Sequence, residues 1–205
     1  MPTPAEILRT LAATSREMTA LAIVWHGLLA FVMIRILTGW RPSKRFGASV
    51  LALPLLSVSV LAWRYGNPFN GAVFAGFAAL LLVLGLRRPA GQVERPPSWA
   101  TIMGSFLILF GWVYPHFLGT GSWLRYLYAA PAGLIPCPTL SFTIGFALLA
   151  NGFSSRGYAT GLGLLGLFYG LFGTFRLGVR IDLVLVIGSL ALLTLSALRV
   201  SRKTK

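Results

Sequence analysis

Cysteine and acidic residues are the scarcest chemical groups in this sequence. Cys137 is the only cysteine, so neither an intramolecular disulfide nor a Cys-x-x-Cys redox pair can form. Four acids stand against eighteen lysines and arginines, and they are Glu6, Glu17, Glu94 and Asp182. Only Asp182 falls within a predicted membrane span, which excludes the multi-aspartate metal sites of lipid-phosphate transferases.

The apolar part of the chain also lacks lysine and the common catalytic motifs. No lysine falls in a predicted membrane span, so a retinal Schiff base is excluded. Neither Gly-x-Ser-x-Gly nor His-Glu-x-x-His occurs. The N-terminus mixes both charge signs and has no continuous apolar core before a cleavage site, so it does not resemble a signal peptide. The sequence therefore lacks the usual parts of an enzyme, and we predict no catalytic residue.

Hydrophobic residues are what the chain has in abundance. They make up 56% of it, and charged residues make up 11%, whereas about a quarter of a soluble domain is charged. The net charge of +14 comes from basic residues in short loops between apolar runs. This distribution is typical of topology signals and of contacts with anionic lipids, not of a nucleic-acid-binding face. We predict a polytopic membrane protein with no nucleic-acid partner.

Seven apolar stretches approach the ~20 residues that a membrane-spanning helix needs. They are residues 18–37, 48–63, 71–86, 99–118, 140–153, 159–175 and 181–198. The predicted fold is a single all-α domain over 1–205, with a broken or re-entrant segment before the fifth span. Residues 1–17 would form an amphipathic or interfacial helix, 18–198 the helix bundle and 199–205 a basic tail.

The distribution of basic residues predicts the orientation. Twelve of the eighteen lie on one side of the predicted spans, in or beside the loops 38–47 and 87–98, near Arg156 and in the tail. By the positive-inside rule, the N-terminus is outside and the C-terminus is in the cytoplasm. The expected location is the cytoplasmic (inner) membrane, with anionic lipids at the cytoplasmic face.

A pair of prolines marks the most unusual stretch of the chain. Pro136 and Pro138 flank Cys137, and neither has a backbone N–H, so we expect the fifth helix to begin at Pro138 or Thr139. Its free N–H groups could bind an anion or polar solute, and Thr139 and Thr143 would place two hydroxyls on the same face. The alternative is that the threonines bond to their own helix and the prolines only shape a loop.

Asp182 and Tyr114 complete the candidate binding site. Asp182 opens the seventh span and could be a coupling carboxylate for proton or cation movement. An ion pair with Arg176 or Arg180 is the alternative. Tyr114 begins the irregular stretch that leads to Cys137.

A metal site is a further hypothesis. His26, His116 and Cys137 are all predicted on the outer side, and imidazole and thiolate ligands suit copper(I) or zinc. Two histidines could instead bind haem. Each residue also has a structural interpretation, because a membrane histidine often bonds a neighbouring helix and a lone cysteine often packs as an apolar residue. We predict no cofactor and keep a metal ion or haem as the alternative.

The sixth span is rich in glycine. Gly163, Gly166, Gly170 and Gly173 lie near one helical face, which favours close helix packing. This face could pack within the chain, against a second copy in a homo-oligomer or against a membrane partner. A pore lining is the alternative.

Several motifs together resemble a known family. They are Gly66-Asn67-Pro68 followed by GAVFAGF, Tyr114-Pro115, PAGLIPCPTLSFTIG and FGTFRLGVRIDLVLVIGSL. The chain is similar along nearly its whole length to a family of bacterial multi-pass membrane proteins of unknown function that carry a Pro-Cys-Pro-Thr signature. The resemblance implies an integral membrane fold and no particular activity.

Three functional hypotheses follow. The first is a carrier or channel for a small polar solute or ion that uses the Pro136–Pro138 turn, Thr139, Thr143 and Asp182. The second is a non-catalytic membrane subunit or scaffold. The third is a metal- or haem-binding membrane protein.

Overall fold

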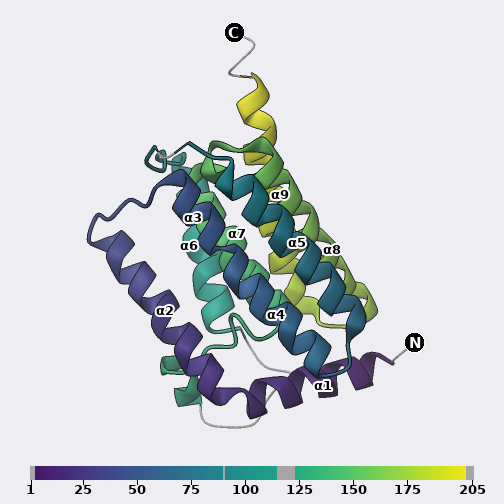
Figure 1. The fold of residues 1–205 in the computed structure, drawn as a ribbon. Coiled ribbons are helices and arrows are strands. Elements are labelled where there is room, and N and C mark those ends of the chain that lie inside the picture. The colour runs from purple at the N-terminus through teal and green to yellow at the C-terminus, as the bar shows by residue number, and fades with distance from the viewer. Residues whose placement is uncertain (1–2, 90, 115–122, 202–205) are drawn as a thin grey trace.

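Helices account for nearly all of the regular structure. The computed structural model describes residues 3–89, 91–114 and 123–201 (Figure 1). About 80% of the described residues are helical, and these residues form no strand. An isolated bridge joins Ser43 to Gln92 between two loops at one end of the bundle.

The described part contains nine α-helices and four short helical turns. The α-helices are α1 (Pro4–Glu17), α2 (Thr19–Leu37), α3 (Lys44–Val50), α4 (Ala52–Arg64), α5 (Pro68–Leu86), α6 (Ser98–Trp112), α7 (Pro136–Leu149), α8 (Arg156–Leu171) and α9 (Leu183–Ser201). The short turns are η1 (Trp123–Leu127), η2 (Asn151–Ser154), the π-helical η3 (Phe172–Arg176) and η4 (Arg180–Asp182).

Five stretches of the described residues are long and apolar enough to cross a membrane. They are Thr19–Ile36, Lys44–Arg64, Pro68–Leu86, Arg156–Arg176 and Arg180–Leu198. The fourth and fifth predicted spans correspond to α6 and α7, which have only 15 and 14 residues. The apolar helices therefore indicate a membrane protein, and the count of seven spans is not confirmed.

Proline and left-handed residues explain why α6 and α7 are short. Tyr114 precedes a proline, which disfavours helical backbone, and α6 ends at Trp112 instead of reaching the predicted residue 118. Residues 115–118 of that prediction lie outside the described part. At the end of α7, Asn151 and Phe153 have φ values of 49° and 51°, so this helix ends at Leu149 rather than at the predicted residue 153.

The second predicted span is a helix with a kink. It begins at Lys44, four residues before the predicted residue 48, because the Ser43 hydroxyl accepts a hydrogen bond from Phe46 N–H and caps the helix. The kink separates α3 from α4 at Leu51. Pro54 explains it, since proline cannot donate to the carbonyl four residues earlier and crowds it.

The α7 helix forms the centre of the bundle, and nearly all of its residues are buried. Glycines let α6 approach it closely, because a Cβ at Gly104 or Gly111 would meet the α7 carbonyls of Gly145 or Pro138 at 2.8 Å. Helix α8 approaches α9 in the same way. A side chain at Gly163 or Gly170 would collide with α9 residues, so this glycine face packs within the chain.

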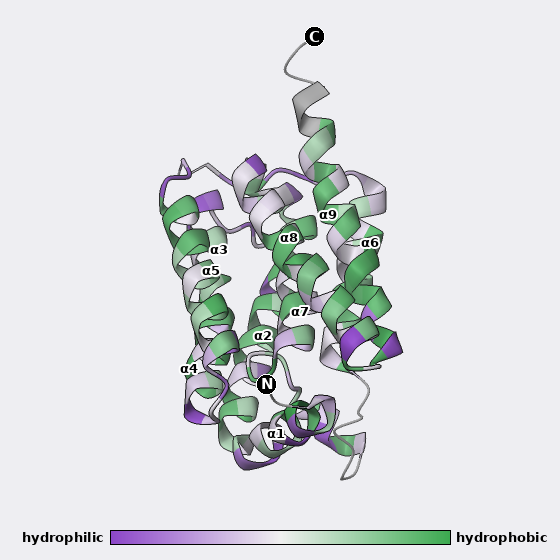
Figure 2. Cartoon of the chain, turned by 90° about the vertical axis from the view of Figure 1, so that its right-hand side faces the viewer, coloured by the Kyte–Doolittle hydropathy of each residue, from purple (hydrophilic) through white to green (hydrophobic). Residues whose placement is uncertain are grey.

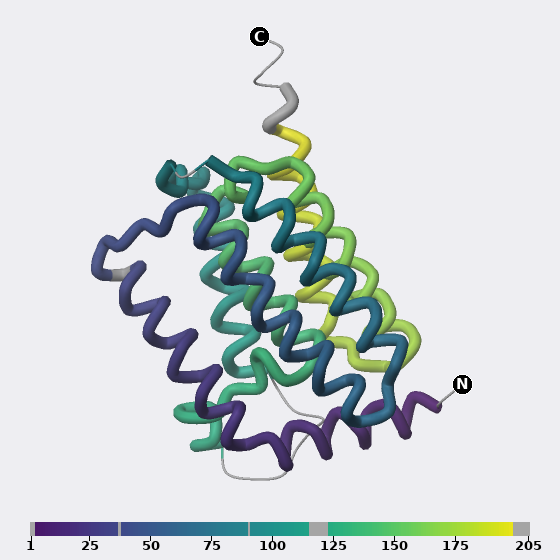
Figure 3. Tube along the Cα trace, in the orientation of Figure 1, coloured from purple at the N-terminus to yellow at the C-terminus, as the bar shows by residue number. Residues whose placement is uncertain are grey.

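The first two helices lie at the border of the bundle (Figures 1 and 3). Helix α1 crosses one end of it, and a Thr3–Glu6 capping box begins it. The interfacial role of α1 stays a prediction. Helix α2 runs beside the bundle. Only 17% of its Thr19–Ile36 window is buried inside the protein, against 56% for Arg156–Arg176. Helix α2 is therefore the least enclosed of the long apolar helices.

Hydrophilic residues gather at the two ends of the bundle, and the helices between them are hydrophobic (Figure 2). The basic loops before α3 and before α6 lie at the same end as the C-terminus, and α1 lies at the opposite end (Figure 1). The orientation in a membrane stays a prediction.

Candidate functional site

A buried carboxyl group, a thiol and a phenol meet at the α1 end of the bundle. The Tyr114 hydroxyl donates to Asp182 Oδ1 at 2.5 Å, and the Cys137 thiol donates to Asp182 Oδ2 at 3.3 Å. Asp182 is 1% exposed. We refer to these three residues as the Asp182 cluster.

A broken helical connection positions Asp182. After α8 the chain widens into the π-helical turn η3, and η4 then places Asp182 directly before α9. Gly173 lies against the carboxylate, and a Cβ there would overlap Asp182 Oδ2. The Val179 carbonyl accepts the Asp182 N–H at 2.9 Å. Gly173 is thus needed for the carboxylate to face Tyr114 and Cys137.

Cys137 lies in the first turn of α7, not in a break between helices as the sequence suggested. The helix begins at Pro136 because proline is compatible with the first helical position, where its missing N–H has no partner to lose. The non-helical segment precedes it, at residues 128–135. Residues 129–135 are buried beneath α1, α2 and α4, and Gly133 (φ +86°) fits against the Trp25 ring.

Tyr114 is held by its backbone as well as by its hydroxyl. Its carbonyl accepts a hydrogen bond from the Tyr126 hydroxyl at 2.9 Å, and the Tyr126 carbonyl accepts one from Trp112 Nε1 at 3.0 Å. The Tyr114 side chain is 1% exposed, and its hydroxyl is directed at the carboxyl group of Asp182.

The two threonines of the candidate site bond to backbone. Thr139 Oγ1 accepts from Gly133 N–H at 2.8 Å and donates to the Ile135 carbonyl at 2.6 Å. The Thr143 hydroxyl donates to the Leu140 carbonyl at 3.1 Å. Both side chains are buried. The Thr139 bonds fasten the start of α7 to the turn before it, whereas the Thr143 bond lies within α7.

Asp182 is not neutralised by its basic neighbours. Arg176 and Arg180 are exposed, and among the residues that the structure describes neither forms an ion pair with Asp182. The donors of the Asp182 cluster are both neutral groups.

The residues proposed for a metal site are not brought together by the described part of the chain. His26 Nδ1 accepts a hydrogen bond from Ala130 N–H at 3.3 Å, and its ring packs edge-on against Trp112 at 4.4 Å between centroids. His116 lies outside the described residues. Within those residues, no group of three or more histidines, cysteines and acids could hold a metal ion.

Sequence reasoning missed several polar residues near the Asp182 cluster. Tyr169, in the same packed core as Cys137, donates to Asn70 Oδ1 at 2.8 Å. In the π-turn, Thr174 Oγ1 is buried and has no hydrogen-bond partner among the described residues. Polar side chains inside apolar runs, such as Asn70 at the start of α5, were the available signal.

Comparison with known proteins adds no relative. No family model matches the chain, and neither the curated proteins nor the solved structures contain a significant match. The resemblance to a multi-pass family with a Pro-Cys-Pro-Thr signature stays a prediction.

Proposed function

We propose that this protein is a membrane carrier or channel for a small ion or polar solute, in which Asp182 exchanges a proton or binds the transported cation. One observation carries the proposal. Asp182 is 1% exposed and has no cationic partner among the described residues. Acids buried among membrane helices are costly and typically lie on ion or proton pathways.

The backbone around the Asp182 cluster supports this role. Transport sites in membrane proteins are often built where helices are interrupted, and a π-helical turn frequently marks a functional position. Here η3 and η4 interrupt the path from α8 to α9, and α7 begins beside them. The thiol and phenol are both bonded to the carboxyl group, so a proton can be shared among three exchangeable groups.

The proposed setting is the cytoplasmic membrane, with seven spans and the Asp182 cluster toward the outer face. The basic loops at the opposite end of the bundle support this orientation. Membership of the multi-pass family with a Pro-Cys-Pro-Thr signature belongs to the same proposal.

Flux through the purified protein tests the function. Liposomes that contain a pH-sensitive dye should show proton movement when a membrane potential is imposed, and Asp182→Asn should remove most of it. Glu94→Gln is the matched control, because Glu94 is an exposed acid that pairs with Lys44 at the other end of the bundle. Flux equal to that of empty liposomes, or unchanged flux in Asp182→Asn, would contradict the proposal.

A scaffold role is the second candidate, and the exposure of α2 favours it. Large apolar side chains such as Phe31 (61% exposed) and Ile34 (59%) project outward from this helix. A membrane partner could cover them as well as lipid does. The distinguishing result is a stoichiometric partner that co-purifies in mild detergent, together with no flux from the isolated chain.

A further inference from the structure

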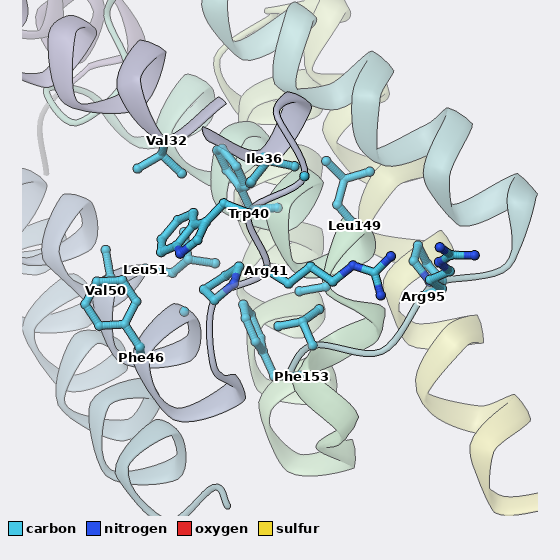
Figure 4. Close-up of a pocket in the computed structure, with 17 residues that line it drawn as sticks. Val32, Ile36, Trp40, Arg41, Phe46, Val50, Leu51, Arg95, Leu149 and Phe153 are labelled. Carbon is cyan, nitrogen blue, oxygen red and sulfur yellow. The ribbon is translucent and has the colours of Figure 1, made fainter. Parts of the chain in front are cut away.

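A pocket separates α2 from the bundle at the end opposite the Asp182 cluster. Its volume is about 280 Å³, close to the lower limit of roughly 300 Å³ for ligand pockets. The walls are largely apolar and come from three parts of the chain. They include Val32 and Ile36 of α2, Phe46 and Leu51 near α3, and Leu149 and Phe153 at the end of α7 (Figure 4). We refer to this space as the α2 pocket.

A separate apolar hollow lies nearer the start of α2. This hollow of about 390 Å³ lies between α2 and α4, lined by residues that include Leu21, Trp25, Leu53 and Val60. The Trp25 indole donates to Ser57 Oγ at 2.9 Å and ties the lower part of α2 to α4. Helix α2 is thus fastened near its start and leaves apolar space beside α4 and α7.

Two arginines stand at the rim of the α2 pocket. Arg41 and Arg95 both line it, and in Figure 4 their guanidinium groups project to the same side. Both side chains are exposed, and neither has an ion pair or side-chain hydrogen bond to any other residue that the structure describes. The acid next in sequence to Arg95, Glu94, pairs with Lys44 at 2.6 Å. The rim therefore carries uncompensated positive charge.

The backbone fixes the spacing of the two arginines. Their loops are joined by Lys44 N–H to the Gly91 carbonyl at 2.9 Å and by Val93 N–H to the Pro42 carbonyl at 3.2 Å. Trp40 lines the same rim, and an amphipathic indole is suited to the boundary between hydrocarbon and headgroups.

We infer that the α2 pocket binds one anionic phospholipid. An acyl chain lies between α2 and α7, and the headgroup phosphate is bound by Arg41 and Arg95. An apolar interior under a cationic rim matches the two halves of such a lipid, and guanidinium groups bind phosphate oxygens in bidentate geometry. The pocket also lies at the end of the bundle where the basic loops gather, the side at which anionic headgroups are most attracted. The inference does not depend on the role of Asp182.

Native mass spectrometry of the full-length protein tests this site. The delipidated protein in mild detergent is titrated with phosphatidylglycerol and with phosphatidylcholine of the same acyl chains. We expect one phosphatidylglycerol to be retained about tenfold more strongly than phosphatidylcholine, as a charge-assisted contact predicts. Equal retention of the two lipids would overturn the inference.

Matched variants separate the site from general surface charge. The double variant Arg41→Gln/Arg95→Gln should remove the preference for phosphatidylglycerol. Arg87→Gln/Arg156→Gln should keep it, because these exposed arginines have the same charge and lie outside the pocket. If both double variants lose the preference for phosphatidylglycerol equally, the binding is due to general surface charge, and the proposed site is wrong.

A third variant tests the apolar half. Val32→Phe places a larger side chain in the α2 pocket and should weaken retention of both lipids by a similar factor. Since α2 is mostly exposed, it has room to adjust, and the variant should elute as the parent protein does. Unchanged lipid retention in a correctly folded Val32→Phe protein would overturn the placement of the acyl chain. If inorganic phosphate displaces the lipid and Val32→Phe does not change lipid retention, the placement of the acyl chain is likewise overturned.

Discussion

The two ends of α7 are built in opposite ways. At its start, Cys137 and Asp182 are pressed together with Tyr114, and glycines bring the surrounding backbone into contact. At its far end, about 20 Å away at 1.5 Å per residue, α2 leaves an open apolar pocket. The polar groups of the first end bond to one another, whereas the side chains of the two arginines of the second form no ion pair or hydrogen bond with another described residue.

The polar groups of the Asp182 cluster hold one another in place, whereas the arginines of the α2 pocket can contact another molecule. The Asp182 cluster is buried, and its polar groups are bonded to one another. An open pocket with uncompensated charge at its rim has groups left over for a larger molecule. The comparison therefore predicts that substitutions which change side-chain volume lower the free energy of unfolding much more at the closely packed centre than at the α2 pocket.

The largest expected effect comes from truncating the packed centre. Leu107 is fully buried on α6 and touches α9 at Gly188, so Leu107→Ala should destabilise the protein by about 2–5 kcal/mol. Ile36→Ala is the matched control in the wall of the α2 pocket. Because the wall already faces open space, its cost should be below about 1.5 kcal/mol. Unfolding titrations in mixed micelles measure the free energy of unfolding of both variants. Equal losses of stability would contradict the expected difference between the packed centre and the α2 pocket.

The next effect concerns close backbone approach. Gly173→Ala should destabilise the protein by about 1–3 kcal/mol, because the new Cβ overlaps the Asp182 carboxylate. Gly27→Ala on α2 meets nothing within 4 Å and should instead stabilise its helix by about 0.5–1 kcal/mol. The two thermal unfolding midpoints should move in opposite directions, and a shared direction would argue against the tight contact at Gly173.

An effect of similar size is expected from removing one hydroxyl. Tyr114→Phe deprives the buried Asp182 of a donor and should reduce stability by about 1–3 kcal/mol. Tyr65→Phe is the control, because the Tyr65 hydroxyl bonds Glu17 near the surface at 2.7 Å and its loss should cost below about 1 kcal/mol. Equal costs in the same unfolding assay would mean that burial does not distinguish the two bonds.

The smallest effect is a pH dependence at α1. Hydrogen bonds from the Thr3 backbone and hydroxyl lower the pKa of Glu6 below its usual 4.5. Because the pKa of Glu6 is lower in the folded protein, these bonds stabilise α1 at pH values above the pKa that Glu6 has in the unfolded chain. The stabilisation is lost as the pH falls through the pKa that Glu6 has in the folded protein. Hydrogen exchange at the start of α1 should therefore show extra local opening below pH 4.5, beyond the normal pH dependence of exchange. Thr3→Ala removes the hydroxyl donor and keeps the backbone N–H, so it should reduce this pH-dependent opening and leave α2 exchange unchanged.

Composition and turn residues predicted most of the helical architecture. The seven apolar runs all occur as helices or helix pairs. Helix α6 is shorter than predicted. Helix α7 is shifted towards the N-terminus instead: it begins at Pro136, and positive φ values at Asn151, Phe153 and Ser154 follow its end at Leu149. The sequence also singled out Tyr114, Cys137 and Asp182, which the fold brings together. It left open whether Thr139 and Thr143 bond to nearby backbone and whether Arg176 or Arg180 pairs with Asp182, because those outcomes depend on local geometry.

The sequence by itself determined an all-helical chain with apolar helices, since 56% hydrophobic residues in long runs can form little else in a membrane. Only the tertiary structure decided which helices touch. Gly173 leaves room for the Asp182 carboxylate. The hydrogen bond from Trp25 to Ser57 fastens the first part of α2 to α4, and a pocket lies between the last part of α2 and the bundle. Hydropathy carries no such information, because apolar side chains attract one another without direction, and the shapes of the packed surfaces select the partners.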